Sequence, residues 1–190
     1  MQEDKEYFIL EKPNPVDSRS SAAADLPVPP PELREGYGKT EEEYLDSGRK
    51  DVEKMLEVLA QAGENSQTLS KVLELGCAAA RMLRFYPYHQ NKSEIWGVDI
   101  MSRNISWCQN NLSPRIQFAT TTSAPHLPFE DNYFDLVYCG SVFTHISDLA
   151  DAWFLELRRI LRKGGYMYIT IHDESSIKIL LDEYKDVSYL

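Results

Sequence analysis

Short apolar runs alternate with amphipathic segments from Lys71 onward. The runs with the length and composition of buried strands are 71–75, 94–99, 116–119, 134–138 and 166–171. Helical spacing of apolar residues predicts helices over 79–86, 102–112 and 149–161. This alternation predicts a parallel sheet with helices on both faces, because right-handed crossovers place the helices there. The expected fold class is therefore α/β, with a doubly wound, mostly parallel sheet.

The beginning of the chain is rich in proline. Residues 11–35 contain Pro13, Pro15, Pro27 and the run 29–31. Proline removes backbone donors and favours extended polyproline structure. We therefore expect an extended arm over residues 1–35 that does not belong to the core.

A helical segment is expected after the arm. Thr40 and Glu43 have the spacing of a capping box at a helix start. The pair Ser47 and Gly48 is expected to break this stretch into a short turn and a helix over 49–62, because glycine weakens a helix interior. The predicted divisions are the arm 1–35, a helical lid segment 36–66 and a core domain 67–190.

Composition and charge narrow the class of protein. A hydrophobic fraction of 43% and a charged fraction of 26% are those of a globular domain. The formal net charge of −10 argues against nucleic acid as a partner, because binding a polyanion requires clustered Lys and Arg. No apolar stretch approaches the roughly 18 residues of a membrane span, so we expect a cytoplasmic protein with no membrane partner. The odd set Cys77, Cys108 and Cys139 has no metal-type spacing, which predicts reduced thiols and no metal site.

The residues that follow the predicted strands indicate a ligand site. In an open parallel sheet, ligands bind outside the carboxyl ends of the strands. After the first strand, Gly76 opens a run of small residues that lets a ligand approach the backbone. Asp99 ends the second strand, about 20 residues beyond that turn, where an acid can accept hydrogen bonds from ribose hydroxyls. Ile100 or Met101 can then pack on an adenine ring.

Four ordered blocks of this sequence resemble the class I S-adenosylmethionine-dependent methyltransferases. The blocks are 72–77, 96–100, 127–138 and 157–165, and the resemblance covers about residues 70–172. The stretch 31–48 is also similar to the N-terminal lid of a bacterial small-molecule subgroup. The resemblance implies a Rossmann-like fold, S-adenosylmethionine as cofactor, and transfer of its methyl group to oxygen or nitrogen of a small-molecule acceptor.

The resemblance also implies roles for particular residues. Those implied for the methionine part of the cofactor are Glu74, Gly76, Cys77 and Ala78. Asp99 would hold the ribose, and Thr122 and Ser123 would lie at the adenine edge. Cys139, Gly140 and Ser141 would form the floor near the sulfonium. Tyr37, with Tyr44, Phe143 and Trp153, could line the cofactor and acceptor pocket. The alternative is that Phe143 and Trp153 bury a helix face, which is favoured for Trp153. His145 and His172 follow predicted strands and are the candidate general bases, although a histidine at a strand end is more often structural.

The sequence departs from the family pattern in three places. Ala78 and Ala80 stand where the family usually has glycine, which makes a positive φ costly. Thr122 or Ser123 stands where the family often has an acid that holds the adenine amino group. After Ile171 there is no room for both strands of the family's C-terminal antiparallel hairpin. Either the sequence is a fragment of a longer protein, or a second copy completes the sheet edge as a homodimer.

Two other functions compete with an active methyltransferase. A non-catalytic cofactor-binding or scaffolding remnant of the same fold would explain the alanine-substituted turn and the missing strands. A nicotinamide-dependent oxidoreductase would also place small residues after the first strand and an acid after the second. That enzyme needs a glycine for helix packing at the position of Arg81, which argues against it.

Overall fold

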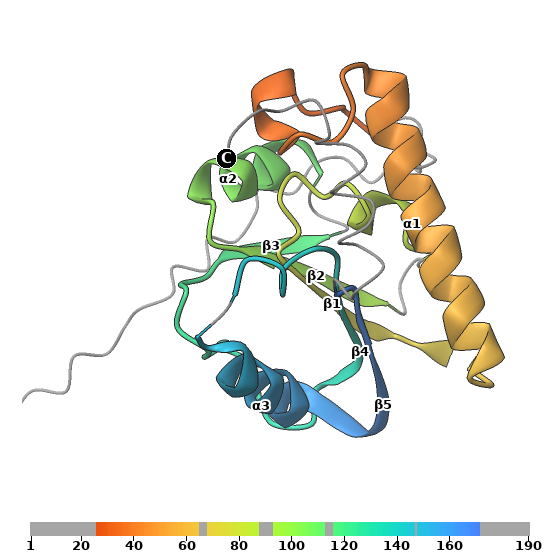
Figure 1. Cartoon of the computed structure of the whole chain (residues 1–190), viewed down its shortest axis with the longest axis vertical. Helices are drawn as coiled ribbons and strands as arrows, with labels where there is room; N and C mark the ends of the chain where they lie inside the picture. Colours follow the sequence, from red (N-terminus) through yellow and green to blue (C-terminus); the bar gives the residue numbers. More distant parts are fainter. Residues whose placement is uncertain (1–25, 65–67, 88–92, 113–115, 147, 172–190) are drawn as a thin grey trace, which may run out of the picture.

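The computed structural model describes residues 26–64, 68–87, 93–112, 116–146 and 148–171. Its centre is a five-stranded sheet of order β3-β2-β1-β4-β5 (Figure 1). The strands are β1 (Lys71–Leu75), β2 (Glu94–Asp99), β3 (Gln117–Thr120), β4 (Phe134–Cys139) and β5 (Leu161–Ile169). Each neighbouring pair in this sheet is parallel. The predicted α/β fold with a doubly wound, parallel sheet is confirmed.

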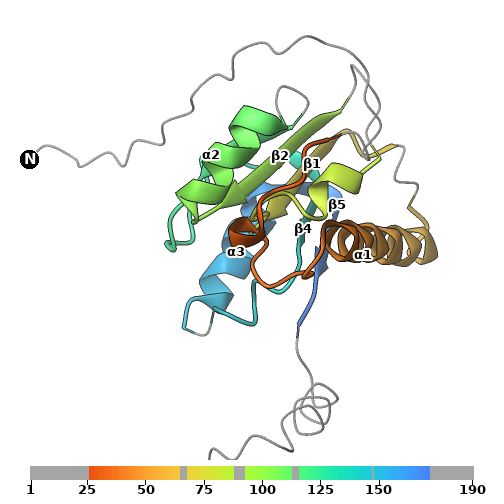
Figure 2. The same ribbon diagram turned by 90° about the horizontal axis from the view of Figure 1, so that it is seen from above.

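Helices cover both faces of the sheet (Figures 1 and 2). Helices α1 (Glu41–Gln61) and α2 (Ser102–Asn111) pack on one face, where the core includes Val72 and Leu136. Helix α3 (Ala150–Ile160) packs on the other face, against Leu73 and Val137. Successive strand side chains point to opposite faces, so each strand contributes to both layers of the core.

Helix α1 begins where the sequence predicts. The Thr40 side chain accepts a hydrogen bond from the Glu43 N–H, and the Glu43 side chain accepts one from the Thr40 N–H. The expected break at Ser47 and Gly48 is wrong, because α1 continues through both residues. Gly48 is buried, and a Cβ placed on it would lie 2.1 Å from the carbonyl oxygen of Arg81. The glycine allows the helix to approach the turn after β1.

We expect the substitution Gly48→Ala to destabilise the protein by about 2 kcal/mol, although alanine is the better helix former by about 1 kcal/mol. The added methyl group would have to displace backbone, which a packed core resists. Urea unfolding measures the difference in the free energy of unfolding. A gain in stability would show that α1 does not approach this turn closely.

The segment after β1 differs from its predicted helix. Residues 79–86 form turns and a short 3-10 helix, Leu83–Phe85, in place of an α-helix. Ala78 and Ala80 have φ angles of 45° and 59°, in the left-handed region. Consecutive α-helical residues require negative φ, so the chain cannot enter a regular helix here.

The last strand begins earlier than predicted. Strand β5 starts at Leu161 and runs through Gly164 and Gly165, which were expected to precede it. A Cβ on Gly165 would lie 2.9 Å from the Asp135 carbonyl oxygen, and the pairing with β4 shifts register between Phe134 and Leu136. The glycines therefore form an irregularity within the strand. The outer edge of β5 has no partner among the described residues, and the expected homodimer stays a prediction.

The end of the predicted arm contributes to the core, contrary to expectation. Leu33 is buried in the layer under α1, and the buried Arg34 donates a hydrogen bond to the Pro29 carbonyl oxygen (3.0 Å). Residues 1–25 and the helix expected over 176–184 lie outside the described residues, and the predicted domain division stays a prediction. Within the described residues, no helix has the length and apolarity needed to cross a membrane.

Candidate functional site

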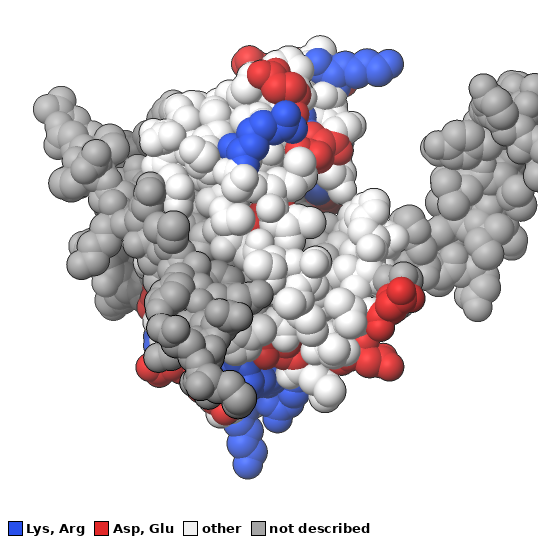
Figure 3. Space-filling view, turned by 90° about the vertical axis from the view of Figure 1, so that its left-hand side faces the viewer, with Lys and Arg blue, Asp and Glu red and all other residues white. Residues whose placement is uncertain are grey.

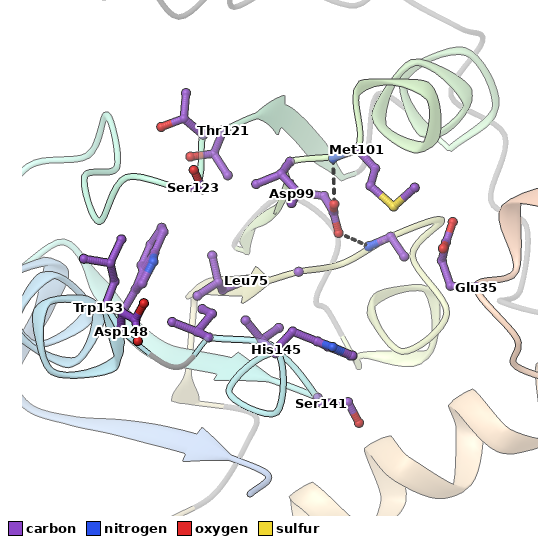
Figure 4. Close-up of a pocket in the computed structure, with 18 of the residues that line it drawn as sticks. Glu35, Leu75, Asp99, Met101, Thr121, Ser123, Ser141, His145, Asp148 and Trp153 are labelled. Atoms are coloured by element: carbon purple, nitrogen blue, oxygen red, sulfur yellow. Dashed lines mark hydrogen bonds between the residues drawn. The ribbon is translucent and has the colours of Figure 1, made fainter. Parts of the chain in front are cut away.

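A cavity of about 710 Å³ lies at the carboxyl ends of β1, β2, β3 and β4. Figure 3 looks onto this side of the molecule, where the surface is largely uncharged and charged side chains gather at its upper and lower margins. Figure 4 shows the lining side chains, with Thr121 and Ser123 across the cavity from His145. This is the place where parallel sheets bind ligands.

Asp99 connects the end of β2 to the turn after β1. Its Oδ2 accepts a hydrogen bond from the Ala78 N–H (2.7 Å), and its Oδ1 accepts one from the Met101 N–H (2.8 Å), as drawn in Figure 4. The side chain is buried but still lines the cavity. A carboxylate offers about four acceptor sites, so two remain for a ligand's hydroxyl groups. The turn and the aspartate therefore face one shared cavity.

The turn after β1 keeps a glycine-type backbone although it contains alanines. Gly76, Ala78 and Ala80 all have positive φ, at 72°, 45° and 59°. The N–H groups of Gly76 and Cys77 both donate to the Val98 carbonyl oxygen, at 2.8 and 3.1 Å. These bonds hold the turn against β2 and offset the strain at the alanines.

Most of the predicted site residues lie on the cavity wall. The lining residues that the sequence singled out for the cofactor are Tyr37, Gly76, Ala78, Asp99, Ile100, Thr122, Ser123 and Gly140. His145, a candidate base, also lines the cavity, whereas His172 lies outside the described residues. Their roles stay predictions.

Three predicted cofactor residues do not line this cavity. Glu74 and Cys77 border a small void of about 30 Å³ behind the turn, and Cys139 is buried against α3. Side chains alternate along a strand, so Leu75 faces the cavity while Glu74 faces the opposite layer. Any contact of these residues with a cofactor would have to go through their backbone or through that void.

Two acidic residues of the wall were missed by the sequence analysis. Glu35 precedes α1, and Asp148 precedes α3. Both lie in loops with no motif to mark them, so only the fold brings them to the site. With Asp99 they give the cavity three carboxylates, and no Lys or Arg is among its lining residues. The site favours a cationic ligand.

Glu74 is a buried carboxyl group behind the turn. It is 3% exposed, and the Tyr138 hydroxyl donates a hydrogen bond to its Oε2 (3.2 Å). Burial raises the pKa of Glu74 to about 8, partly offset by the charge of Arg81 and the bond from Tyr138. A carboxyl group in this environment keeps its proton at neutral pH.

This raised pKa predicts a pH dependence of stability. The folded protein keeps the Glu74 proton up to about pH 8, whereas the unfolded chain loses it above about pH 4.5. The contribution of Glu74 to the free energy of unfolding is therefore fully present below about pH 4.5, and it declines as the pH rises to about 8. Glu74→Gln, which is neutral throughout, should remove this decline. Urea unfolding of both proteins across this range checks it, and parallel curves would contradict it.

The cysteines lie in the two core layers. All three are free and buried, and burial raises the pKa of Cys139 to about 12. Such thiols are poor nucleophiles at neutral pH. Among the described residues, no group of three His, Cys, Asp or Glu is arranged to hold a metal ion.

Comparison with known proteins identifies the family. Residues 73–169, about half of the 190-residue chain, match the family described as methyltransferase domain. The chain is 32% identical over 107 residues to the uncharacterized methyltransferase YcgJ of Bacillus subtilis, a match that covers 54% of this chain and 40% of that protein. It spans less than half the length of the curated relatives it matches.

Solved structures show the same fold. YcgJ of Bacillus subtilis superimposes with a TM-score of 0.50 and 25% identity, covering 68% of this chain and 56% of that one. A putative sarcosine dimethylglycine methyltransferase from Galdieria sulphuraria gives a TM-score of 0.52 and 27% identity, covering 72% and 54%.

These matches confirm the resemblance and the Rossmann-like fold expected from the sequence. S-adenosylmethionine is the cofactor that this family implies. The chain belongs to the methyltransferase-domain family.

Proposed function

We propose that this chain binds S-adenosylmethionine in the cavity at the carboxyl ends of β1–β4 and transfers its methyl group to a small-molecule acceptor. The observation that carries the proposal is the hydrogen bond from the Ala78 N–H to the Asp99 carboxylate at the cavity wall. This hydrogen bond joins the small-residue turn to the acid. S-adenosylmethionine is a nucleoside attached to an amino acid, so the groups that bind its two parts have to lie next to each other.

The residues present fit this cofactor. The turn at Gly76 and Ala78 would hold the methionine part, and the unused acceptor sites of Asp99 would hold the ribose hydroxyls. Ile100 is 60% exposed at the cavity and offers an apolar surface to the adenine ring. Thr121 Oγ1 is buried without a hydrogen-bond partner among the described residues, and it would serve the polar edge of that ring.

The chain's main tasks are to hold the reactants and to exclude water. When bound, the cofactor would supply a methyl carbon on a cationic sulfur, and that sulfur would keep the carbon–sulfur electron pair when the acceptor's lone pair took the methyl group. The three carboxylates of the wall favour that positive charge. Leu75, Val142 and Ile146 give the same wall apolar surface that excludes water. His145 is the residue that would accept a proton from a hydroxyl acceptor.

Isothermal titration calorimetry with S-adenosylhomocysteine tests cofactor binding, and transfer of labelled methyl across an acceptor panel tests activity. We expect saturable binding and a labelled product. Absence of binding by the folded chain would overturn the assignment of the cavity. Binding without transfer to any acceptor would favour the non-catalytic remnant.

A further inference from the structure

A second, smaller cavity of about 260 Å³ lies beside the main one. It is enclosed by α1, the turn after β1 and the ends of β4 and β5. Its lining residues are Tyr37, Asp51, Lys54, Arg81, Met82, Gly140, Ser141, Thr144, Tyr168, Thr170 and Ile171. The comparisons and the family resemblance assign it no role.

Three residues separate the two cavities. Tyr37, Gly140 and Ser141 line both. In Figure 4, Ser141 lies away from Thr121 and Ser123, toward the orange helix α1. The family resemblance implies that Gly140 and Ser141 form the floor near the sulfonium, so the second cavity would begin where the methyl group is delivered.

We call the wall shared by the two cavities the partition, and Ser141 in this wall is held in a strained conformation. Ser141 has a φ of 58°, which a residue with a side chain rarely adopts. Its N–H donates to the Thr170 hydroxyl (2.7 Å), and its carbonyl accepts from the Thr144 hydroxyl (2.7 Å). Such strain persists where surrounding bonds impose it, and it is frequent at ligand sites.

The two cavities differ in charge. The main cavity has three carboxylates and no Lys or Arg, whereas the second has Lys54 and Arg81 with a single carboxylate, Asp51. Asp51 forms an ion pair with Arg81 (2.6 Å), whose guanidinium also stacks on the Tyr37 ring (3.9 Å to its centroid). The carboxylate of Asp51 therefore neutralises the charge of Arg81. No carboxylate among the lining residues is left to neutralise the charge of Lys54.

Lys54 is available to a ligand. Its only ion pair among the described residues is with the exposed Glu57, one turn along α1, and an exposed pair contributes little to stability. Tyr168 also lines the cavity, and its hydroxyl makes no hydrogen bond to another described residue. An ammonium and a phenol hydroxyl are both donors, and together they can hold an anionic group.

We propose that the second cavity is the methyl-acceptor site, and that it takes a small carboxylic acid carrying an amino or hydroxyl group. The carboxylate would pair with Lys54 and Tyr168, and the amino or hydroxyl group would face the partition at Ser141. A hydroxyl group would lose its proton to His145, as in the proposed function, and an amino group would lose its proton to water. The inference rests on the proposed function, because it needs the cofactor to occupy the main cavity with its sulfonium near Gly140 and Ser141.

Calorimetry of the full chain saturated with S-adenosylhomocysteine tests this inference. The probes are small 2-amino and 2-hydroxy acids, such as alanine and lactate, each beside its primary amide, which keeps the shape and loses the carboxylate charge. We expect at least one acid to bind at least tenfold more tightly than its amide. We expect the same acid to accept labelled methyl from S-adenosylmethionine.

Two variants test whether Lys54 and Tyr168 bind the acid directly, or whether any positive charge on α1 has the same effect. Lys54→Gln should weaken acid binding about fivefold and leave amide binding unchanged, and Tyr168→Phe should weaken acid binding about threefold. Lys50→Gln is the matched control, because Lys50 lies one turn earlier on α1, is equally exposed and does not line the cavity. It should change nothing.

The outcomes separate this inference from the proposed function. If S-adenosylhomocysteine does not bind, the proposed function fails first. If it binds but no acid does, or amides bind as tightly as acids, or Lys54→Gln behaves like Lys50→Gln, the acceptor-site inference alone is overturned.

Discussion

Asp99→Ala should weaken the binding of S-adenosylhomocysteine at least a hundredfold. The proposed ribose contacts are charge-assisted hydrogen bonds, each with a contribution of about 1.5–3 kcal/mol, and two of them account for that loss. The substitution also leaves the Ala78 and Met101 N–H groups without their acceptor. We therefore expect the free energy of unfolding to fall by about 2 kcal/mol. Calorimetry measures the first effect and urea unfolding the second.

Glu156→Ala is the control that separates binding from stability. Glu156 is as buried as Asp99, at 7% exposure, and its Oε1 accepts a hydrogen bond from the Leu127 N–H (2.6 Å). It lies on α3 and does not line the main cavity. This variant should lose stability and keep its affinity for S-adenosylhomocysteine. Equal losses of affinity in the two variants would show that Asp99 acts only through folding.

The sheet was predictable from the sequence because its strands contain short apolar runs, which are most complete in the central strands β1 and β4. Strand β1 has four consecutive buried residues, and β4 has buried residues at all but its second position. Strands covered on both faces have this pattern, and alternating helices then leave a doubly wound sheet as the expected arrangement. The capping box at Thr40 was predictable because capping depends on neighbouring residues alone.

Features that depend on contacts between distant segments were not predictable. Gly48 was expected to break a helix, because its sequence neighbours do not reveal that the Arg81 backbone lies against it. The helix predicted over 79–86 has suitable apolar spacing, yet the left-handed Ala78 and Ala80 exclude it. In both cases tertiary packing outweighs a local preference of about 1 kcal/mol.

The same distinction applies to the candidate site. Gly76 and Asp99 were predictable because they follow strands at a set spacing, and the fold brings all such positions to one edge. Glu35 and Asp148 come from loops, and the charge of the cavity became visible only with the fold. Lys54 lies on α1 in a charged, solvent-exposed stretch, where nothing in the sequence separates it from Lys50.

Gly76→Ala should destabilise the protein by about 3 kcal/mol, from two causes that can be separated. Its φ of 72° would cost an alanine about 1–2 kcal/mol. The new Cβ would also lie 2.3 Å from Cγ2 of Val142, which lines the main cavity, so the wall of the binding site would have to move. Urea unfolding measures the loss of stability, and calorimetry with S-adenosylhomocysteine measures the loss of affinity that we expect from the displaced wall.

Gly63→Ala isolates the first cause, because Gly63 has a φ of 85° and a Cβ there would meet no atom within 4 Å. That variant should lose only about 1–2 kcal/mol and keep its affinity. Adding Val142→Ala to Gly76→Ala removes the clashing methyl group, so the double variant should recover part of the affinity lost by Gly76→Ala alone. The change in binding free energy in the double variant, minus the sum of the changes in Gly76→Ala and Val142→Ala, measures the coupling between the turn and the cavity wall. If the two changes are simply additive, Gly76 is required for its backbone conformation and not for its closeness to Val142.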